Sequence, residues 1–271
     1  MSRDKEILIV GTGKMGTALI NGWSYFNDFA VIGIDPLTPT LDDLNEQPFI
    51  FYHSFDDYLD GYHKPKAIVF AIKPQSFPEV LPQYRAIIEA DKPLVISIAA
   101  GITVETIRRL SGAKSVIRAM PNLPATVGEG MTALLADDCF KHQIKLAEEL
   151  MEAVGEVEWL TRESDFDAVT ALSGSGPAYV FLLAEYLAEA GVSLGLEPEV
   201  ANRLAIQTVA GAGRMLYLAE DSPSELRKMV TSKGGTTEAA LKILMRDGGL
   251  KQELIKAVTA AFNRSQELGK K

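Results

Sequence analysis

The sequence begins with a pattern that restricts the fold more than any other stretch of the chain. Residues 7–10 form a continuous apolar run of strand length, and Gly11-Thr12-Gly13-Lys14-Met15-Gly16 follows at once. A helical segment (17–23) and a second apolar run (30–34) come next, and the second run ends at Asp35. Strand, glycine-rich turn, helix, strand and acid in this order predict a dinucleotide-binding βαβ unit.

Each glycine of this turn has its own physical task. Gly11 permits the tight turn, Gly13 lets the backbone approach a pyrophosphate, and Gly16 lets the helix pack close to the strand. The predicted cofactor-binding residues of the turn are Gly11, Thr12, Gly13, Lys14, Met15 and Gly16. A tight turn between strand and helix, with no nucleotide, is the alternative that a motif of this kind leaves open.

Asp35 lies where an acid can hydrogen-bond both ribose hydroxyls of a nucleotide, and we predict it to be a cofactor-binding residue. Its carboxylate would repel a 2′-phosphate, and no Lys or Arg occurs between Asp35 and Lys64 to offset that charge. On this argument the site prefers NADH over NADPH. The alternative is that Asp35 caps the turn with Pro36, because Asp is common in turns.

Apolar segments of strand length continue to alternate with helical segments through the first half of the chain. We expect strands over residues 67–72, 93–100, 115–120 and 156–160, and helices over residues 77–89 and 138–154. This alternation predicts a parallel sheet with helices on both faces. Ligands of such sheets bind beyond the carboxyl ends of the strands, so the loops at Lys73, Gly101 and Asn122 should surround one crevice. A solvated loop lysine and a rigid proline-flanked turn are the alternatives for Lys73 and Asn122.

The second half of the chain has a different character. Its only prolines, Pro177, Pro198 and Pro223, each stand where a helix can begin. Helices are expected over residues 165–173, 176–190, 198–219, 223–230, 236–247 and 250–268, with a capping box at 222–225. The sequence therefore predicts a dinucleotide-binding domain over 1–160 and an all-helical domain over 161–271.

Two of these helices contain stretches that are poor in charge, at residues 179–184 and 205–213. A helix that is apolar all round is buried on all sides. A small helical domain has little room for two such helices, so we expect the subunits to associate. An unusually apolar monomer core is the alternative.

Composition argues against several classes of function and location. The net charge of −9 repels nucleic acid and anionic membranes. No apolar run is long enough to cross a bilayer, and the start of the chain lacks the apolar core of a signal peptide. The single cysteine, Cys139, fits a reducing compartment, so we expect a cytoplasmic protein. The three histidines have no zinc-ligand spacing, and we expect neither a metal site nor a catalytic triad.

The stretch from Val230 to Leu241 ends one helical segment and begins another. Its turn holds two glycines, Gly234 and Gly235, and four hydroxyl side chains. Glycine lets the backbone approach a ligand closely, and Thr236 or Thr237 can cap the next helix. Such a turn suits a small anion such as a carboxylate. A well-capped corner between two helices is the alternative.

Several motifs resemble those of the pyrroline-5-carboxylate reductase family, over essentially the whole chain. They lie at residues 11–16, 71–75, 118–122, 172–179 and 230–241, and Leu172-Ser173-Gly174-Ser175-Gly176-Pro177-Ala178-Tyr179 is the most specific. The resemblance implies an N-terminal α/β Rossmann-type domain with a parallel sheet and an all-α C-terminal dimerisation domain. Members often assemble as pentamers of dimers, with both subunits of a dimer contributing to the active site. The implied reaction reduces the C=N bond of 1-pyrroline-5-carboxylate to L-proline with NADH or NADPH.

The resemblance also implies roles for individual residues. Substrate-binding residues by motif position are Glu163, Ser232, Gly234, Gly235, Thr236 and Thr237. Thr237 matches the threonine that hydrogen-bonds the ring nitrogen, and Ala71, Ile72, Lys73, Pro74 and Asn122 fall in motifs at the cofactor. Lys233 stands where many members have proline. Asp35 departs from members that prefer NADPH, so the choice of cofactor stays open.

Two other functions compete with this hypothesis. A dehydrogenase of the β-hydroxyacid type would place a catalytic lysine on a helix facing the nicotinamide, and the helical segments offer no compelling candidate. A catalytically silent nucleotide sensor would keep residues 11–16 but would not need the turn at 232–237. Oxidation of NAD(P)H in the presence of pyrroline-5-carboxylate separates these hypotheses.

Overall fold

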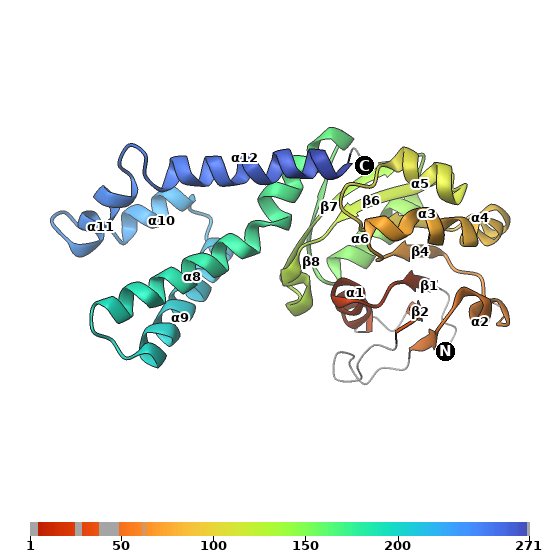
Figure 1. The fold of residues 1–271 in the computed structure, drawn as a ribbon, viewed down its shortest axis with the longest axis horizontal. Coiled ribbons are helices and arrows are strands. Elements are labelled where there is room, and N and C mark those ends of the chain that lie inside the picture. Colours follow the sequence, from red (N-terminus) through yellow and green to blue (C-terminus); the bar gives the residue numbers. More distant parts are fainter. Residues whose placement is uncertain (1–4, 25–28, 38–48, 62, 270–271) are drawn as a thin grey trace. The chain divides into compact units, whose positions relative to one another are not determined.

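The computed structural model describes residues 5–24, 29–37, 49–61 and 63–269, which form two compact units (Figure 1). Unit 1 comprises the described residues of 1–174 and 262–271, and unit 2 comprises residues 175–261. Unit 1 contains the whole sheet, and unit 2 is helical. The domain boundary after residue 160 stays a prediction, because the two units describe compact packing rather than separate folding domains.

The described residues of unit 1 form an eight-stranded sheet in the order β3-β2-β1-β4-β5-β6-β7-β8. Its strands are β1 (Lys5–Val10), β2 (Phe29–Ile34), β3 (Ile50–Tyr52), β4 (Ala67–Phe70), β5 (Leu94–Ser97), β6 (Val116–Met120), β7 (Gly130–Asp137) and β8 (Gly155–Trp159). Every pair of neighbours is parallel except β6 and β7. The predicted α/β class is confirmed, and β7 is the departure from a fully parallel sheet.

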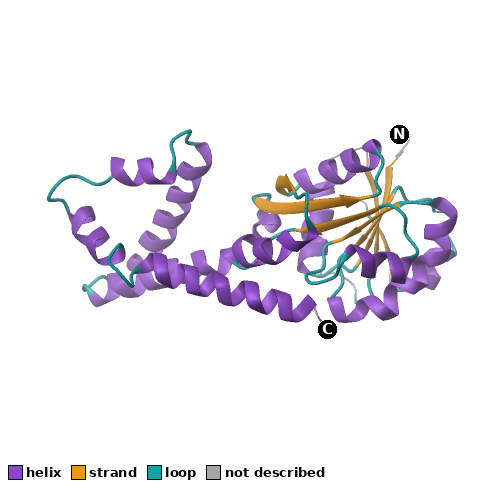
Figure 2. Ribbon diagram, turned by 90° about the horizontal axis from the view of Figure 1, so that it is seen from above, coloured by secondary structure: helices purple, strands orange, loops and turns teal. Residues whose placement is uncertain are grey.

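Helices cover both faces of this sheet (Figure 2) because its central strands are apolar on both sides. In β1, Ile7 and Ile9 belong to one core cluster and Leu8 and Val10 to the other. The first cluster packs against α1 (Lys14–Ser24) and α6 (Lys141–Glu152). The second packs against α2 (Phe55–Leu59), α3 (Phe77–Val80), α4 (Arg85–Asp91) and α5 (Val104–Ser111). The sheet is therefore anchored rigidly, and the loops that leave its edges start from fixed positions.

Proline divides one of the predicted helices. The segment expected as one helix over 77–89 consists of α3, a 3-10 turn (Leu81–Tyr84) and α4. Pro78 and Pro82 each lie in the first turn of a new piece, since proline cannot continue a helix but is tolerated at its start. Four elements were not predicted, namely β3, α2, α5 and β7.

The helices after the sheet follow the predicted segments closely. Unit 1 contains α7 (Phe166–Val169), which continues into a π turn (Thr170–Gly174). The helices that follow are α8 (Gly176–Ser193), α9 (Pro198–Leu218), α10 (Pro223–Met229), α11 (Thr236–Leu244) and α12 (Leu250–Gly269). The capping box of α10 is confirmed: Ser222 Oγ accepts from the Glu225 amide, and Glu225 Oε2 accepts from the Ser222 amide. The last residues of α12, from Phe262, pack within unit 1.

The apolar side chains of α8 and α9 are largely exposed in a single chain. No residue of α8 is buried, and only Ala201 and Ala205 of α9 are. Phe181 and Tyr217 are each 58% exposed. Helices with this composition bury such faces against another subunit. Within the described ranges, no helix has the length and apolar character needed to cross a membrane.

Candidate functional site

The glycine-rich loop between β1 and α1 has the geometry that its sequence predicts. Gly11 has φ +98°, its amide donates to Ile34 O (2.8 Å), and a Cβ there would lie 2.6 Å from Ala71 O. A Cβ on Gly16 would overlap the carbonyl oxygen of Gly11. By contrast, nothing lies within 4 Å of a Cβ built on Gly13. Two glycines are thus required by the fold, and the third leaves its side of the loop open, which fits the close approach of a dinucleotide.

Asp35 holds the glycine-rich loop and the end of β2 together. Its Oδ2 accepts a hydrogen bond from the Thr12 amide (2.7 Å), and its Oδ1 accepts one from the Leu37 amide (2.9 Å). The second bond is the turn cap that the sequence left open as an alternative. The first was not foreseen, and it brings a negative charge against the loop that would carry the pyrophosphate. A contact between Asp35 and a ribose stays a prediction.

The other predicted cofactor residues leave the carboxyl ends of β4 and β6. The Ala71 amide donates to Val10 O (2.8 Å), and Lys73 is exposed at the start of a 3-10 turn. Asn122 follows β6, and its Oδ1 accepts from the Met131 amide (2.8 Å) while its Nδ2 donates to Ser173 O (3.1 Å). The Asn122 side chain is therefore held by hydrogen bonds on both of its polar atoms, and its contact with a cofactor stays a prediction. Since β1, β2, β4 and β6 run in the same direction, these residues lie along one edge of the sheet.

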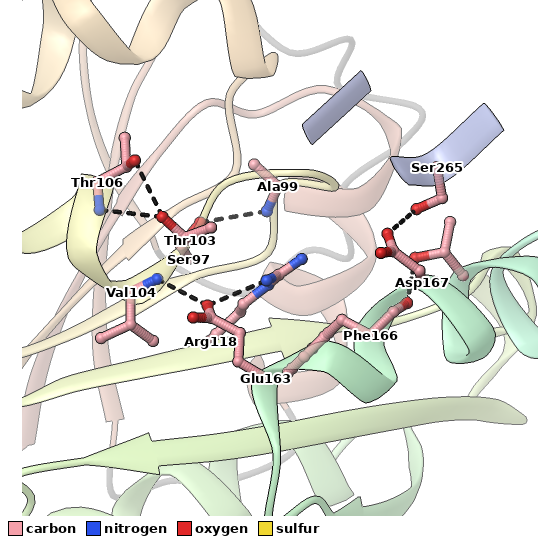
Figure 3. A network of polar contacts seen from close by, with 11 residues as sticks. Ser97, Ala99, Thr103, Val104, Thr106, Arg118, Glu163, Phe166, Asp167 and Ser265 are labelled. Atoms are coloured by element: carbon pink, nitrogen blue, oxygen red, sulfur yellow. Dashed lines mark hydrogen bonds and ion pairs between the residues drawn. The ribbon is translucent and has the colours of Figure 1, made fainter. Parts of the chain in front are cut away.

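Glu163 belongs to a network of polar contacts within unit 1 (Figure 3). Its Oε1 accepts from Arg118 Nη1 (3.0 Å) and from the Val104 amide at the start of α5 (2.8 Å). Arg118 is only 5% exposed, and its guanidinium lies 4.1 Å from the ring centre of Phe166. Burial lowers the pKa of Arg118, and the hydrogen bond and charge of Glu163 oppose that shift. Glu163 thus balances a buried cation and joins β6 to α5.

The same network includes the end of the last helix. Ser265 Oγ donates to Asp167 Oδ1 (2.6 Å), and a carboxylate at Asp167 also raises the pKa of Arg118. Thr170 Oγ1 donates to Phe166 O (2.8 Å), which joins the end of the short helix α7 to its first residue. The residues that follow β8 are therefore fixed to the sheet on one side and to α12 on the other, all within unit 1 (Figure 3).

Cys139 has the surroundings of a structural thiol. Burial raises the pKa of its thiol, and its Sγ lies 3.4 Å from both Val116 O and Asp137 O. A thiol whose pKa is raised has little of the thiolate that nucleophilic catalysis requires. The described residues also contain no group of three or more His, Cys, Asp or Glu that could hold a metal ion.

The turn before α11 is a separate candidate site in unit 2. The Gly235 amide donates to Ser232 O (3.0 Å), and Gly234 has φ +73°, which is the geometry of a type II turn. A Cβ on Gly235 would lie 2.5 Å from Ser232 Oγ, so the serine side chain folds back over this glycine. Gly235 is the N-cap of α11 and has no side-chain cap, so the predicted cap by Thr236 or Thr237 is wrong.

This turn presents hydrogen-bonding groups that have no partner within the described part of the chain. They include the hydroxyls of Ser232, Thr236 and Thr237 and the first backbone amides of α11. The first amides of a helix have no acceptor inside the helix. One amide of the turn is different, because Gly234 donates to Glu238 Oε2 (2.6 Å). The arrangement can therefore bind an anion such as a carboxylate.

Sequence reasoning missed several residues of these sites. Arg118 stands within an apolar strand, and only its charge at a buried position would have indicated an acidic partner. Glu238 is an acid in the first turn of a helix that follows two glycines, which is a usable signal for a contact with turn amides. The partners of Glu163 and Asn122 lie 45 and 51 residues away in the chain, and no local pattern indicates them.

Comparison with known proteins identifies relatives of this chain. Residues 163–268 match a family described as pyrroline-5-carboxylate reductase dimerisation, and residues 6–101 match one described as NADP oxidoreductase, coenzyme F420-dependent. The chain is 44% identical to the pyrroline-5-carboxylate reductase of Synechocystis sp. over 216 residues, which cover 79% of each chain.

Two solved structures that align with nearly all of this chain are also similar. A pyrroline-5-carboxylate reductase from Coxiella burnetii is 38% identical, with a TM-score of 0.88 and 97% of each chain covered. A pyrroline carboxylate reductase from Plasmodium falciparum with NADP bound is 28% identical, with a TM-score of 0.83 and coverage of 98% of this chain and 99% of that one. The similarity therefore extends through the sheet and the helices alike.

Proposed function

The chain belongs to the pyrroline-5-carboxylate reductase family, and we propose that its two candidate sites perform the reaction of that family. The reaction is the NAD(P)H-dependent reduction of the C=N bond of 1-pyrroline-5-carboxylate to L-proline, the final step of proline biosynthesis. It needs a hydride donor, a site for a carboxylate and a proton source for the ring nitrogen. The chain offers residues for each of these requirements.

The turn before α11 is the proposed substrate site. The observation that carries this proposal is a set of unpartnered hydroxyls and amides at the positive end of a helix dipole, within the described residues. The substrate-binding residues are Ser232, Gly234, Gly235, Thr236 and Thr237. A carboxylate of the substrate accepts hydrogen bonds from the turn, which fixes the orientation of the ring.

Thr237 is the proposed catalytic residue. When bound, the reduced nicotinamide supplies the hydride, so the protein needs neither a nucleophile nor a metal for that step. The hydride adds to the carbon of the C=N bond, and its electron pair displaces the π electrons onto nitrogen, which takes a proton. The hydroxyl of Thr237 donates its hydrogen bond to that nitrogen and passes its proton to it, while it takes a proton from solvent in return.

The edge of the sheet in unit 1 is the proposed cofactor site. Its residues are Gly11, Thr12, Gly13, Lys14, Met15, Gly16, Asp35, Ala71, Ile72, Lys73, Pro74 and Asn122. The open side of Gly13 admits the pyrophosphate, and Lys14 lies exposed beside it. The carboxylate of Asp35 favours NADH, because its charge repels a 2′-phosphate.

Glu163 is the proposed substrate-binding residue of unit 1, and its two described contacts are structural. Both of them use Oε1, which leaves Oε2 for a contact with the substrate.

Self-association fits both the family match and the exposed apolar helices of unit 2. Assembly as a pentamer of dimers and a cytoplasmic location stay predictions.

Steady-state oxidation of NADH and NADPH with 1-pyrroline-5-carboxylate tests the function. We expect turnover with both cofactors in buffer without added metal. The kcat/KM should be higher with NADH than with NADPH. Absence of turnover with either cofactor would refute the assignment, whereas cofactor binding without turnover would favour the nucleotide sensor. A much higher kcat/KM with NADPH would refute only the argument from Asp35.

A further inference from the structure

One side chain holds the turn before α11 in place. Glu238, the third residue of the helix, accepts a hydrogen bond from the Gly234 amide through Oε2 (2.6 Å). Its Oε1 lies 3.6 Å from Lys242 Nζ one helical turn later. A hydrogen bond to an ionised carboxylate is shorter and stronger than one between neutral groups. Glu238 is therefore the one side chain that restrains the turn among the described contacts of residues 232–235.

The turn needs such a restraint because its own backbone is permissive. Gly234 and Gly235 are adjacent, and glycine has more conformational freedom to lose on ordering than any other residue. Lys233 occupies the second position of the type II turn, where proline would restrict φ. Lysine provides no such restriction, so the bond from Gly234 to Glu238 supplies it from the helix side.

We propose that Glu238 is a positioning residue for the substrate carboxylate. By holding Gly234, it fixes the turn so that the hydroxyl of Ser232 and the first amides of α11 point to one anion. The inference rests on the proposed function of the turn. Lys242 lies beside the Glu238 carboxylate and Lys233 is in the turn itself, so the two lysines offset the negative charge that Glu238 brings near the substrate.

A pair of variants separates positioning from charge. Glu238→Ala removes the acceptor, and we expect the KM for 1-pyrroline-5-carboxylate to rise roughly fivefold, which corresponds to one net hydrogen bond. The KM for NADH should not change, and kcat should change less than KM. Glu238→Gln keeps an acceptor oxygen without the charge, so it should restore most of the wild-type KM. If Glu238→Ala is unstable, Glu238→Asp replaces it, because its shorter side chain withdraws the oxygen from Gly234.

A matched control is present in the same unit. Glu253 also lies in the first turn of a helix and pairs with a lysine, Lys256, at 2.9 Å. Glu253→Ala therefore removes a lysine-paired carboxylate that makes no described contact with the turn, although it is more exposed than Glu238 (63% against 34%), and it should leave the KM unchanged. An equal rise of KM in this control would overturn the proposal, since the effect would then come from general charge.

Proline at position 233 offers an independent test of the same idea. Proline is favoured at the second position of a type II turn, Lys233 has a negative φ, and its amide makes no hydrogen bond among the described contacts. Lys233→Pro should therefore restrain the turn by another means and lower the raised KM of Glu238→Ala in the double variant. A KM in the double variant as high as in Glu238→Ala would contradict the proposal.

The outcomes also separate this proposal from the proposed function. An active wild type in which Glu238→Ala leaves KM unchanged would refute only the role of Glu238. A KM that falls in both Glu238→Ala and Glu238→Gln would show that the carboxylate competes with the substrate for the turn, which also overturns positioning. A wild type without turnover would refute both proposals.

Discussion

The two glycine turns that begin helices α1 and α11 are held by different kinds of contact. In the loop at 11–16, backbone atoms of neighbouring strands and turns fill the space beside Gly11 and Gly16. In the turn at 232–235, Gly234 is exposed and one carboxylate on the helix restrains it, while the Gly235 amide bonds Ser232 O. The packing of the sheet thus specifies the first turn. Hydrogen bonds among residues 232–238 specify the second.

This difference separates folding from function in the effects of mutation. Changes in the packed region of unit 1 should lower the free energy of unfolding, because its charges and glycines fit a close-packed interior. Changes in the turn before α11 should alter catalysis and leave stability nearly unchanged, since no buried group loses a partner there. Five measurements test this contrast.

Glu163→Ala should have the largest effect on stability. It leaves the buried guanidinium of Arg118 without its ion-pair partner, which costs about 3 kcal/mol in the free energy of unfolding. Urea denaturation followed by circular dichroism measures this change. Asp165→Ala removes the exposed pair with Arg162 nearby and should cost less than about 1 kcal/mol. Equal effects of the two variants would mean that the Arg118 network is not a buried one.

Thr237→Ala should lower kcat on the order of 100-fold, the usual contribution of a positioned proton donor. The KM for the cofactor and the melting temperature should stay close to those of the wild type. Thr237→Ser keeps the hydroxyl and should recover most of the rate. A full rate in Thr237→Ala would remove this residue from the mechanism, and a large loss of stability would remove the contrast between the two turns.

Gly16→Ala should destabilise unit 1 by about 2 kcal/mol, because the added methyl overlaps the Gly11 carbonyl and overpacks the loop. Gly13→Ala is the matched control, since open space surrounds its Cβ. That variant should unfold like the wild type but bind NADH more weakly, as measured by quenching of protein fluorescence. Similar unfolding curves for the two variants would show that the loop is not fixed by packing.

Asp35→Asn should shift the ratio of kcat/KM for NADPH to that for NADH by about tenfold in favour of NADPH, through loss of one charge near the 2′ position. The ratio of the two cofactors in one preparation is the measurement, so changes in active enzyme content cancel. Asparagine keeps one acceptor oxygen for the Thr12 amide, which holds the loop, and gives up the bond from the Leu37 amide. An unchanged ratio would mean that Asp35 acts on the turn alone.

Removal of the Glu225 charge from the capping box of α10 by Glu225→Gln should have the smallest effect, which is a small change in melting temperature. Hydrogen bonds from the Ser222 hydroxyl and amide lower the pKa of Glu225. A carboxyl whose pKa is lower in the folded state stabilises the fold above its unfolded pKa, and this stabilisation is lost as pH falls through the folded pKa. The melting temperatures of the wild type and Glu225→Gln should therefore differ slightly at neutral pH and converge in acid. A difference in melting temperature that grows as the pH falls would contradict a stabilising role of the ionised Glu225.

The sequence predicts the fold well where the pattern is local. The order of strand, glycine turn, helix and acid over 7–35 identifies the first βαβ unit, and the prolines and glycines of the second half mark most helix ends. Strand β7 was missed because Gly-Met-Thr-Ala-Leu-Leu-Ala-Asp combines residues that favour helices with no clear alternation. Its antiparallel pairing with β6 is a tertiary choice, which no single segment specifies.

In the candidate sites, too, the sequence predicts local features but not contacts between distant segments. The residues of the glycine loop and of the turn at 232–237 are visible in the sequence because their chemistry is contiguous. The helix cap was predicted at a threonine, but Gly235 takes that position, because its extended backbone (φ −80°, ψ 170°) is that of an N-cap residue and Thr236 is already helical. The bond between Arg118 and Glu163 joins residues far apart in the chain, so only the folded structure reveals it.

The last turns of α12 determine when the packing of unit 1 can be completed during synthesis. Residues 262–269 pack in the unit formed by the described residues up to Gly174, and Ser265 bonds Asp167 across 98 positions of chain. A ribosome releases residues 262–269 well after residues 5–159, so the sheet emerges long before its contact with α12 can form. Folding of unit 1 therefore has a late step of high contact order. Nascent chains that stop before Phe262 should consequently hold the sheet without the hydrogen bond between Ser265 and Asp167.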